Sequence, residues 1–252
     1  MRYTGGVLVQ SYYAGTYSGL FSVDGSYNLI VFTCSGTEAN EVAMRMARMA
    51  TGGTGFICTD ATYHGNSELV ASLTRVGDTD RPGVKAIPFP QRYRPIVEGA
   101  TDDELCEAYL AEVQRAIDEF AAEGTPLAGV IFCSILANEG LPDVPSGFLP
   151  RAAAMVRAAG GVVIMDEVQA GFCRSGRWWG YDLMGVVPDI VTMAKGIGNG
   201  FPLGAVVAQR HIAEKLAGKF TFHTYGASPT SCIVSISPEL NISTFFSALV
   251  SL

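Results

Sequence analysis

Charged side chains are scarce in this chain of 252 residues and make up only 16% of it. Acidic residues outnumber basic ones by 24 to 17, which gives a formal net charge of −7 at pH 7. The sequence has no basic run and no interleaving of basic with aromatic residues. Because a nucleic-acid-binding surface needs clustered positive charge, we expect no nucleic acid partner.

Closely spaced metal ligands are also missing. The six cysteines form no Cys-x-x-Cys pair, and the three histidines (His64, His211 and His223) are scattered along the chain. Zinc sites use ligand pairs at short spacing, so the sequence predicts no metal site. We interpret the cysteines as buried or incidental thiols in a reducing compartment.

Long hydrophobic runs are absent as well. No apolar run approaches the roughly 20 residues that a membrane helix needs. Ser, Gly, Thr and Tyr interrupt residues 1–21 too often for a signal peptide. These absences predict a soluble intracellular protein with no membrane partner. We expect a cytoplasmic location, with mitochondria as the alternative.

Apolar residues and glycine are plentiful, with 48% hydrophobic residues and 29 glycines. Such a composition can form a sizeable core and many tight turns between strands and helices. Short apolar runs bounded by Gly, Asp or Pro predict strands that are buried on both faces. These runs lie at 55–59, 129–133, 161–165, 190–193 and 205–208.

Helical patterns separate most of these strands and lie at residues 37–50, 102–123 and 148–159. The alternation predicts an α/β fold, in which helices flank a mostly parallel sheet. The two ends of the chain lack this pattern. We therefore divide the chain into an atypical N-terminal segment (1–28), a large domain (29–231) and an atypical C-terminal tail (232–252).

Small residues open the helix predicted at 37–50. In the run CSGTEANE (34–41) they leave backbone N–H groups free to bind an anion, most naturally a phosphate. Ser and Thr at this position are equally typical of ordinary N-caps. A second motif, Tyr63-His64-Gly65, follows the first predicted strand. An aromatic side chain there either stacks on a planar cofactor or packs against the protein.

Asp166 and Lys195 follow two later strands. Asp166 ends the apolar run at 161–165, and such positions contact ligands in α/β sheets. Its carboxylate suits the protonated nitrogen of a pyridine ring, and a helix N-cap is the simpler alternative. Lys195 follows the run at 190–193 and precedes a glycine-rich turn. A lysine among apolar residues becomes a nucleophile for carbonyl carbon, whereas a surface lysine does not.

Together these motifs resemble the class III aminotransferases, a pyridoxal-phosphate family of fold type I. The resemblance covers residues 31–231 and is carried by SGTEAN, YHG, DEVQAGFCRSG, PDIVTMAKGIGNGFPLGAVV and HTYGASP. Asp166 and Lys195 lie 29 positions apart, as the family pattern requires. The resemblance implies pyridoxal 5'-phosphate as the cofactor, transamination between an amino donor and a keto acid, and a homodimer.

The resemblance also implies which residues bind the cofactor. Gly36 and Thr37 hold its phosphate with backbone groups. Tyr63 stacks on one face of the pyridine ring, and Val168 packs on the other. Thr224 of HTYGASP resembles the threonine that reaches the phosphate of the neighbouring subunit's cofactor.

Two of the remaining residues are implied to be catalytic. Lys195 bonds the cofactor and, once freed by the substrate amine, takes and returns the substrate proton. Asp166 keeps the ring nitrogen protonated, so that the ring can accept an electron pair. Gln169 contacts the ring hydroxyl.

The sequence departs from the family in three respects. Cys133 stands where the family usually has an acidic residue. Residues 1–28 do not resemble the family's N-terminal arm, and the resemblance stops near Cys232, before the family's small C-terminal domain. We therefore expect a chain that is truncated at both ends and weakly active or inactive by itself. The alternatives are a phospho-lyase acting on an amino-alcohol phosphate, and a cofactor-binding fragment without activity.

Overall fold

The computed structural model describes residues 27–74, 81–216, 223–226, 228 and 231. The segments predicted at 1–28 and 232–252 lie outside these residues, except for Tyr27 and Asn28, which begin the first strand. The division of the chain into three parts therefore stays a prediction. Within the described part, no helix is both long and apolar enough to cross a membrane.

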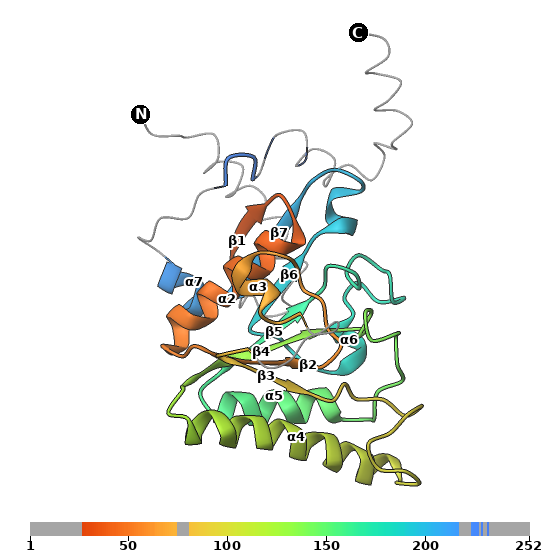
Figure 1. The fold of residues 1–252 in the computed structure, drawn as a ribbon. Coiled ribbons are helices and arrows are strands. Elements are labelled where there is room, and N and C mark those ends of the chain that lie inside the picture. Colours follow the sequence, from red (N-terminus) through yellow and green to blue (C-terminus); the bar gives the residue numbers. More distant parts are fainter. Residues whose placement is uncertain (1–26, 75–80, 217–222, 227, 229–230, 232–252) are drawn as a thin grey trace.

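A single sheet of seven strands lies at the centre of the described fold (Figure 1). In chain order the strands are β1 (Tyr27–Thr33), β2 (Gly55–Thr59), β3 (Val84–Ile87), β4 (Leu127–Cys133), β5 (Val162–Asp166), β6 (Ile190–Met193) and β7 (Gly204–Gln209). Their order across the sheet is β1-β7-β6-β5-β4-β2-β3. β7 is antiparallel to its neighbours β1 and β6, while β2 to β6 run parallel. The prediction of a mostly parallel sheet is confirmed.

Helices flank both faces of this sheet, as predicted. In Figure 1, α2 (Gly36–Thr51) and α7 (Arg210–Leu216) lie on one side, and α4 (Asp102–Ala122) and α5 (Phe148–Ala158) lie together on the other. Two short helices, α3 (Glu68–Ala71) and α6 (Tyr181–Met184), and the 3₁₀ turn η1 (Lys195–Gly198) occupy connections between strands.

Capping residues in the sequence fix the ends of the two longest helices. Ser35 is the N-cap of α2, where its hydroxyl accepts the N–H of Glu38 at 3.2 Å, and Gly52 ends the helix at a φ of 72°. At the start of α4, Thr101 and Glu104 form a capping box. An N-cap of this kind stabilises a helix by about 0.5–2 kcal/mol. The observed helix starts agree with the predicted ones to within one residue.

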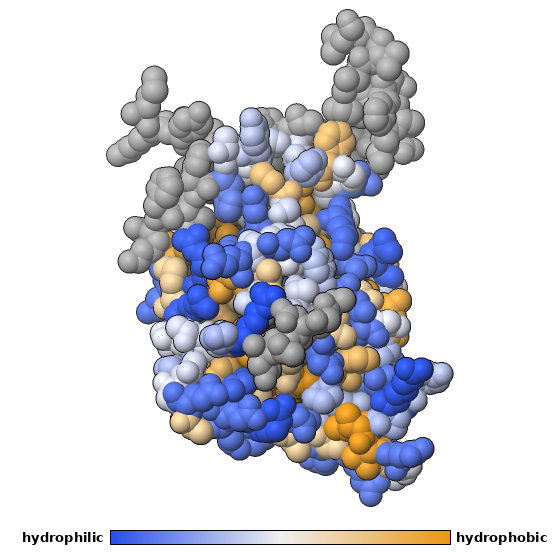
Figure 2. All heavy atoms as spheres, viewed as in Figure 1, coloured by the Kyte–Doolittle hydropathy of each residue, from blue (hydrophilic) through white to orange (hydrophobic). Residues whose placement is uncertain are grey.

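The core has two halves, one on each face of the sheet. Along β5, Val162 and Ile164 pack with α2 and α7, whereas Val163 and Met165 pack with α4 and α5. Both faces are therefore apolar, which explains why the central strands read as unbroken apolar runs. In the lower part of Figure 2, where α4 lies, the surface is mainly hydrophilic.

The candidate active site

The carboxyl ends of the parallel strands lie at one edge of the sheet, and the residues there surround a cavity of about 150 Å³. Ligands of open α/β sheets bind at this edge. The loop after β2, the ends of β4 and β5, the turn after β6 and the first turn of α2 all contribute. The lining consists of Gly36, Thr37, Tyr63, His64, Cys133, Asn138, Asp166, Val168, Gln169, Ala194 and Lys195.

Seven of the eight residues predicted for the site line this one cavity. They are Gly36, Thr37, Tyr63, Asp166, Val168, Gln169 and Lys195. The exception is Thr224, which is exposed in a turn and does not line the cavity. The fold thus brings together motifs that are far apart in the sequence.

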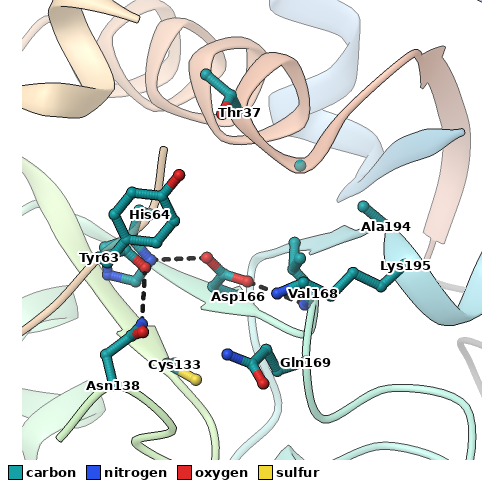
Figure 3. Close-up of a pocket in the computed structure, with 11 residues that line it drawn as sticks. Thr37, Tyr63, His64, Cys133, Asn138, Asp166, Val168, Gln169, Ala194 and Lys195 are labelled. Carbon is teal, nitrogen blue, oxygen red and sulfur yellow. Dashed lines mark hydrogen bonds and ion pairs between the residues drawn. The ribbon is translucent and has the colours of Figure 1, made fainter. Parts of the chain in front are cut away.

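Three N–H groups hold the carboxylate of Asp166, and Figure 3 shows two of them, those of His64 and Val168. Oδ1 accepts the backbone N–H of Val168 at 2.9 Å, and Oδ2 lies 2.9 Å from Nδ2 of Asn40 and 2.7 Å from Nδ1 of His64. Only 7% of the Asp166 side chain is exposed. Asp166 does not cap a helix, because the next described helix, α6, begins at Tyr181. Its hydrogen bonds fix its orientation at the cavity.

A buried polar network surrounds Asp166, and the sequence assigned no role to its members. Besides Asp166, Asn40 donates to the backbone oxygen of His64 at 2.7 Å and accepts from the Thr192 hydroxyl at 2.6 Å. Nε2 of His64 lies 2.8 Å from the hydroxyl of Thr62. Asn40 and His64 stand inside the SGTEAN and YHG motifs, but they are 126 and 102 positions from Asp166. Only the fold reveals that they meet it.

The first turn of α2 approaches its neighbours closely at two glycines. A side chain at Gly36 would place its Cβ 3.0 Å from Cγ2 of Val168, and one at Gly65 would lie 2.5 Å from the hydroxyl oxygen of Thr37. Gly65 also has a φ of 142°, which L residues rarely adopt. Backbone N–H groups at the start of a helix lack partners within it, and the helix dipole is positive there. The turn therefore offers an anion site that borders the cavity.

Tyr63 and the residues after β5 flank Asp166 on opposite sides. Figure 3 shows the Tyr63 ring on one side, with Val168 and Gln169 on the other. The backbone oxygen of Tyr63 accepts Nδ2 of Asn138 at 3.1 Å, which ties the loop after β2 to the loop after β4. A flat group between these side chains would have apolar contacts on both faces.

Cys133 forms an uncharged part of the cavity wall. It pairs in register with Asp166 on the next strand, and only 4% of it is exposed. Burial, and then the negative charge of Asp166, raise the pKa of the Cys133 thiol to about 12. The thiol is therefore neutral at pH 7, and an acidic residue here would put a second negative charge beside Asp166.

Lys195 lies in a strained turn directly after β6. Its backbone is left-handed, with a φ of 45°, and Ala194 before it is extended. A non-glycine residue in this conformation costs about 1–3 kcal/mol, and such strain is concentrated at functional sites. Both residues line the cavity, but only Ala194 is buried, whereas Lys195 is exposed. The structure therefore does not place Lys195 among buried apolar residues, as the sequence had suggested, but at the open side of the cavity.

The turn that contains Thr224 lies near the start of α2. Nδ1 of His223 is 3.7 Å from the Glu38 carboxylate, and a Cβ at Gly226 would lie 2.7 Å from the backbone oxygen of Phe32. Thr224 lies between these two residues and is exposed. Its role at a neighbouring subunit's cofactor stays a prediction.

The model of the family described as aminotransferase class III matches residues 5–242. The chain belongs to the class III aminotransferases. This finding confirms the resemblance that the motifs indicated. The match also includes residues 5–30 and 232–242, so the bounds of 31–231 predicted for the resemblance were too narrow.

Comparisons with individual proteins agree with the family. The chain is 39% identical over 211 residues to alanine–glyoxylate aminotransferase 2 homolog 2, a mitochondrial protein of Arabidopsis thaliana. The aligned part is 82% of this chain and 43% of that relative. The chain therefore spans less than half of the relative's length.

Two solved structures share the fold. A phospholyase from Arthrobacter, in complex with phosphoethanolamine, is 37% identical to this chain and has a TM-score of 0.80. The superposition covers 88% of this chain and 54% of the phospholyase chain. Taurine:2-oxoglutarate aminotransferase from Bifidobacterium kashiwanohense, in complex with PLP and glutamate, is 26% identical and has a TM-score of 0.79. Here the superposition covers 90% of this chain and 53% of the aminotransferase chain. These neighbours identify the sheet and its helices as fold type I.

Proposed function

We propose that the cavity at the carboxyl edge of the sheet binds pyridoxal 5'-phosphate for transamination between an amino donor and a keto acid. One observation carries this proposal: Asp166 and Lys195 line the same cavity, at the N-terminus of α2. Family membership and the PLP in the Bifidobacterium structure support the choice of cofactor.

The residues around the cavity fit this cofactor. Gly36 and Thr37, at the positive end of α2, would hold the phosphate with backbone N–H groups. The pyridine ring would lie between Tyr63 and Val168. This leaves Asp166 to face the ring nitrogen.

The two polar side chains that remain have roles in the same arrangement. Gln169 would contact the ring hydroxyl, and the amine of Lys195 would bond the aldehyde carbon. Both side chains line the cavity together with Asp166. No other described lysine or arginine lines it, so Lys195 is the candidate nucleophile.

When bound, the cofactor supplies an aldehyde that bonds amines and a protonated ring that accepts an electron pair. The chain contributes orientation and proton transfer. Asn40, His64 and the Val168 N–H fix the negative charge of Asp166 in one direction. The amine of Lys195 would accept a proton from the substrate's α carbon and later donate it, as general base and then general acid.

A second function, elimination of phosphate from an amino-alcohol phosphate, is favoured by a specific observation. The Arthrobacter phospholyase, whose structure holds phosphoethanolamine, is 37% identical to this chain. That is higher than the identity to the taurine aminotransferase, 26%, and close to the 39% shared with the Arabidopsis aminotransferase. Both reactions would use the same cofactor and the same Lys195, so the cavity described above does not distinguish them.

The partner we propose is a second copy of the chain, with Thr224 reaching the phosphate in the other subunit. Thr224 supports this role because it is exposed and lies in a turn that contacts the start of α2. For the compartment we keep the cytoplasm as the proposal. The mitochondrial name of the Arabidopsis relative supports the alternative.

Product analysis tests the function directly. The purified chain, loaded with pyridoxal phosphate, is incubated with L-alanine and glyoxylate, and pyruvate and glycine are measured by mass spectrometry. A parallel reaction with phosphoethanolamine is assayed for inorganic phosphate. Glycine formation that depends on Lys195 supports transamination, with Lys195→Ala as the control. Phosphate release without glycine would favour the lyase, and neither product would indicate a cofactor-binding fragment.

A further inference from the structure

The segment between Asp166 and α6 is closed at both ends by one buried side chain, Glu167. Oε2 of Glu167 accepts the N–H of Gly180, and Oε1 accepts the N–H of Tyr181, both at 2.9 Å. The backbone of Glu167 is itself tied to β6, because its N–H donates to the Thr192 oxygen at 2.8 Å. The carboxylate therefore joins the beginning of the segment 168–179 to its end.

Glu167 is fully buried, and no ion pair with it is found among the described residues. Burial and then the negative charge of Asp166 raise the pKa of its carboxyl group, and the N–H groups of Gly180 and Tyr181 oppose this rise. A side chain at Gly180 would collide with Ser134 and Ala170. Burying a glutamate side chain costs desolvation energy unless hydrogen bonds compensate for it. The two N–H groups at 180–181 provide this compensation, so Glu167 is tied to the end of the loop.

The segment that Glu167 closes carries part of the cavity wall. Val168 and Gln169, its first two residues, line the cavity. Further along, Phe172 packs against Gly196, the residue after Lys195, where a Cβ would lie only 3.2 Å from the Phe172 side chain. The segment therefore contacts the site at two places, beside Asp166 and beside Lys195.

An aromatic cluster fills the inside of the segment. The Phe172 ring lies edge-on to Trp178 and Trp179, with ring centres 6.1 and 5.2 Å apart. Trp179 stacks on Tyr181 at 6.2 Å, with an angle of 4° between the rings. The N–H of Phe172 also donates to the backbone oxygen of Trp178 at 2.9 Å, so the cluster closes the far part of the segment while Glu167 joins its two ends.

We propose that Glu167 is a positioning residue of the site, because its side chain joins the start of the segment to residues 180–181. In this way it holds Val168 and Gln169 at the cavity and Phe172 against the turn that contains Lys195. The carboxylate suits this role because it has two acceptor oxygens for two N–H groups. The amide of a glutamine at this position has only one acceptor oxygen, and its NH₂ group would face the second N–H donor and repel it. The link to cofactor binding rests on the proposed function, but the position of the segment does not.

The two tryptophans of the chain are Trp178 and Trp179, so intrinsic tryptophan fluorescence reports on this segment alone. In the intact protein Trp179 is 2% exposed and Trp178 is 42% exposed. For Glu167→Gln we expect emission at longer wavelength and stronger quenching by acrylamide, with an unchanged far-UV circular dichroism spectrum. We also expect trypsin to cleave after Arg174 and Arg177 at least about tenfold faster, as for loss of one charge-assisted hydrogen bond.

Asp182→Asn is the matched control, because it removes one negative charge from an exposed side chain beside the segment. It should leave fluorescence and cleavage unchanged. Glu167→Asp is the second variant. Its shorter side chain cannot reach both N–H groups, so it should loosen the segment as Glu167→Gln does.

Titration with pyridoxal phosphate completes the test, and we expect the Kd of Glu167→Gln to rise by about tenfold relative to the Asp182→Asn control. Unchanged tryptophan quenching and cleavage in both Glu167 variants would overturn the proposal. Loss of the whole fold in both variants would overturn it too, because Glu167 would then stabilise the entire domain. If the unaltered chain binds no cofactor, the proposed function fails, while the fluorescence and cleavage results still decide the role of Glu167.

Discussion

At the scale of single residues, the site depends on the orientation of one carboxylate. Asp166 would have several rotamers in a looser cavity, but the side chains of Asn40 and His64 and the N–H of Val168 select one. Thr192 and Thr62 in turn fix Asn40 and His64. Each polar group of this network has a partner, as buried polar groups require.

Replacing Asp166 tests the role of its charge. Asp166→Asn keeps the size of the side chain but removes the charge, and its N–H₂ group opposes the N–H donors of Asn40 and His64. Breaking a buried charge pair costs about 3–5 kcal/mol, so we expect pyridoxal phosphate to bind at least about a hundredfold more weakly. Spectrophotometric titration measures this, with Asp182→Asn as the control. Equal affinity of Asp166→Asn and the unaltered chain would disprove an interaction between Asp166 and the ring nitrogen.

The cysteines offer a second test at this scale. Cys173 is exposed, whereas Cys133 is buried and has a thiol pKa of about 12. At pH 8 only roughly one Cys133 thiol in ten thousand is ionised, and the thiolate is the reactive form. We therefore expect brief treatment with iodoacetamide to alkylate Cys173 and spare Cys133, as peptide mass spectrometry would reveal. Labelling of Cys133 as fast as Cys173 would show that the cavity opens to solvent far more than its burial indicates.

At the scale of helices and strands, the sequence predicted the central elements well and the peripheral ones poorly. The strand at 190–193 and the start of the helix at 102 agree with β6 and α4. Buried strands leave an unbroken apolar run, so their position is visible in the sequence. β3 (Val84–Ile87) was missed because it is a short, half-buried edge strand that contains Lys85.

The site was predictable where a motif contains the residue, and it was not where contacts cross the fold. Asp166 and Lys195 were predicted from their places after apolar runs, and both line the cavity. The contacts of Asn40 with Asp166 and Thr192 join different elements, so no local pattern reports them. The same holds for Glu167, whose partners Gly180 and Tyr181 lie at the far end of a loop.

An ion pair at the start of α4 gives a prediction on stability against pH. Asp102 accepts Nε of Arg92 at 2.6 Å and the N–H of Ser146 at 3.1 Å. Hydrogen bonds, first from Arg92 and then from Ser146, lower the pKa of Asp102 from 3.8 to about 2. Because the pKa is lowered on folding, the stabilisation is complete above the unfolded pKa and is lost as the pH falls through about 2.

The variant Asp102→Asn lacks this contribution at every pH. Its deficit in unfolding free energy, relative to the unaltered chain, should therefore be largest above pH 5 and should shrink between about pH 4 and 2. Urea unfolding of both proteins at pH 6 and pH 3 measures the difference. An equal deficit at both pH values would mean that the Asp102 charge has no part in it.

At the scale of the whole molecule, the sheet divides the core into two halves and leaves its carboxyl edge for the site. Strands β2, β4, β5 and β6 end there, and α2 begins there, so the described part of the chain supplies seven of the eight predicted site residues to one cavity. The chain spans 43% of the length of its Arabidopsis relative. Cofactor binding is thus the property that the described residues most directly support.

The central claim, that this cavity holds pyridoxal phosphate through Lys195, is tested most directly by mapping the bonded lysine. The chain is incubated with pyridoxal phosphate, reduced with sodium borohydride, digested and analysed by peptide mass spectrometry, beside a Lys195→Ala control. We predict one major adduct, on the peptide that contains Lys195, and its loss in the control. A major adduct on Lys85, Lys215 or Lys219, or an adduct that persists in Lys195→Ala, would contradict the claim.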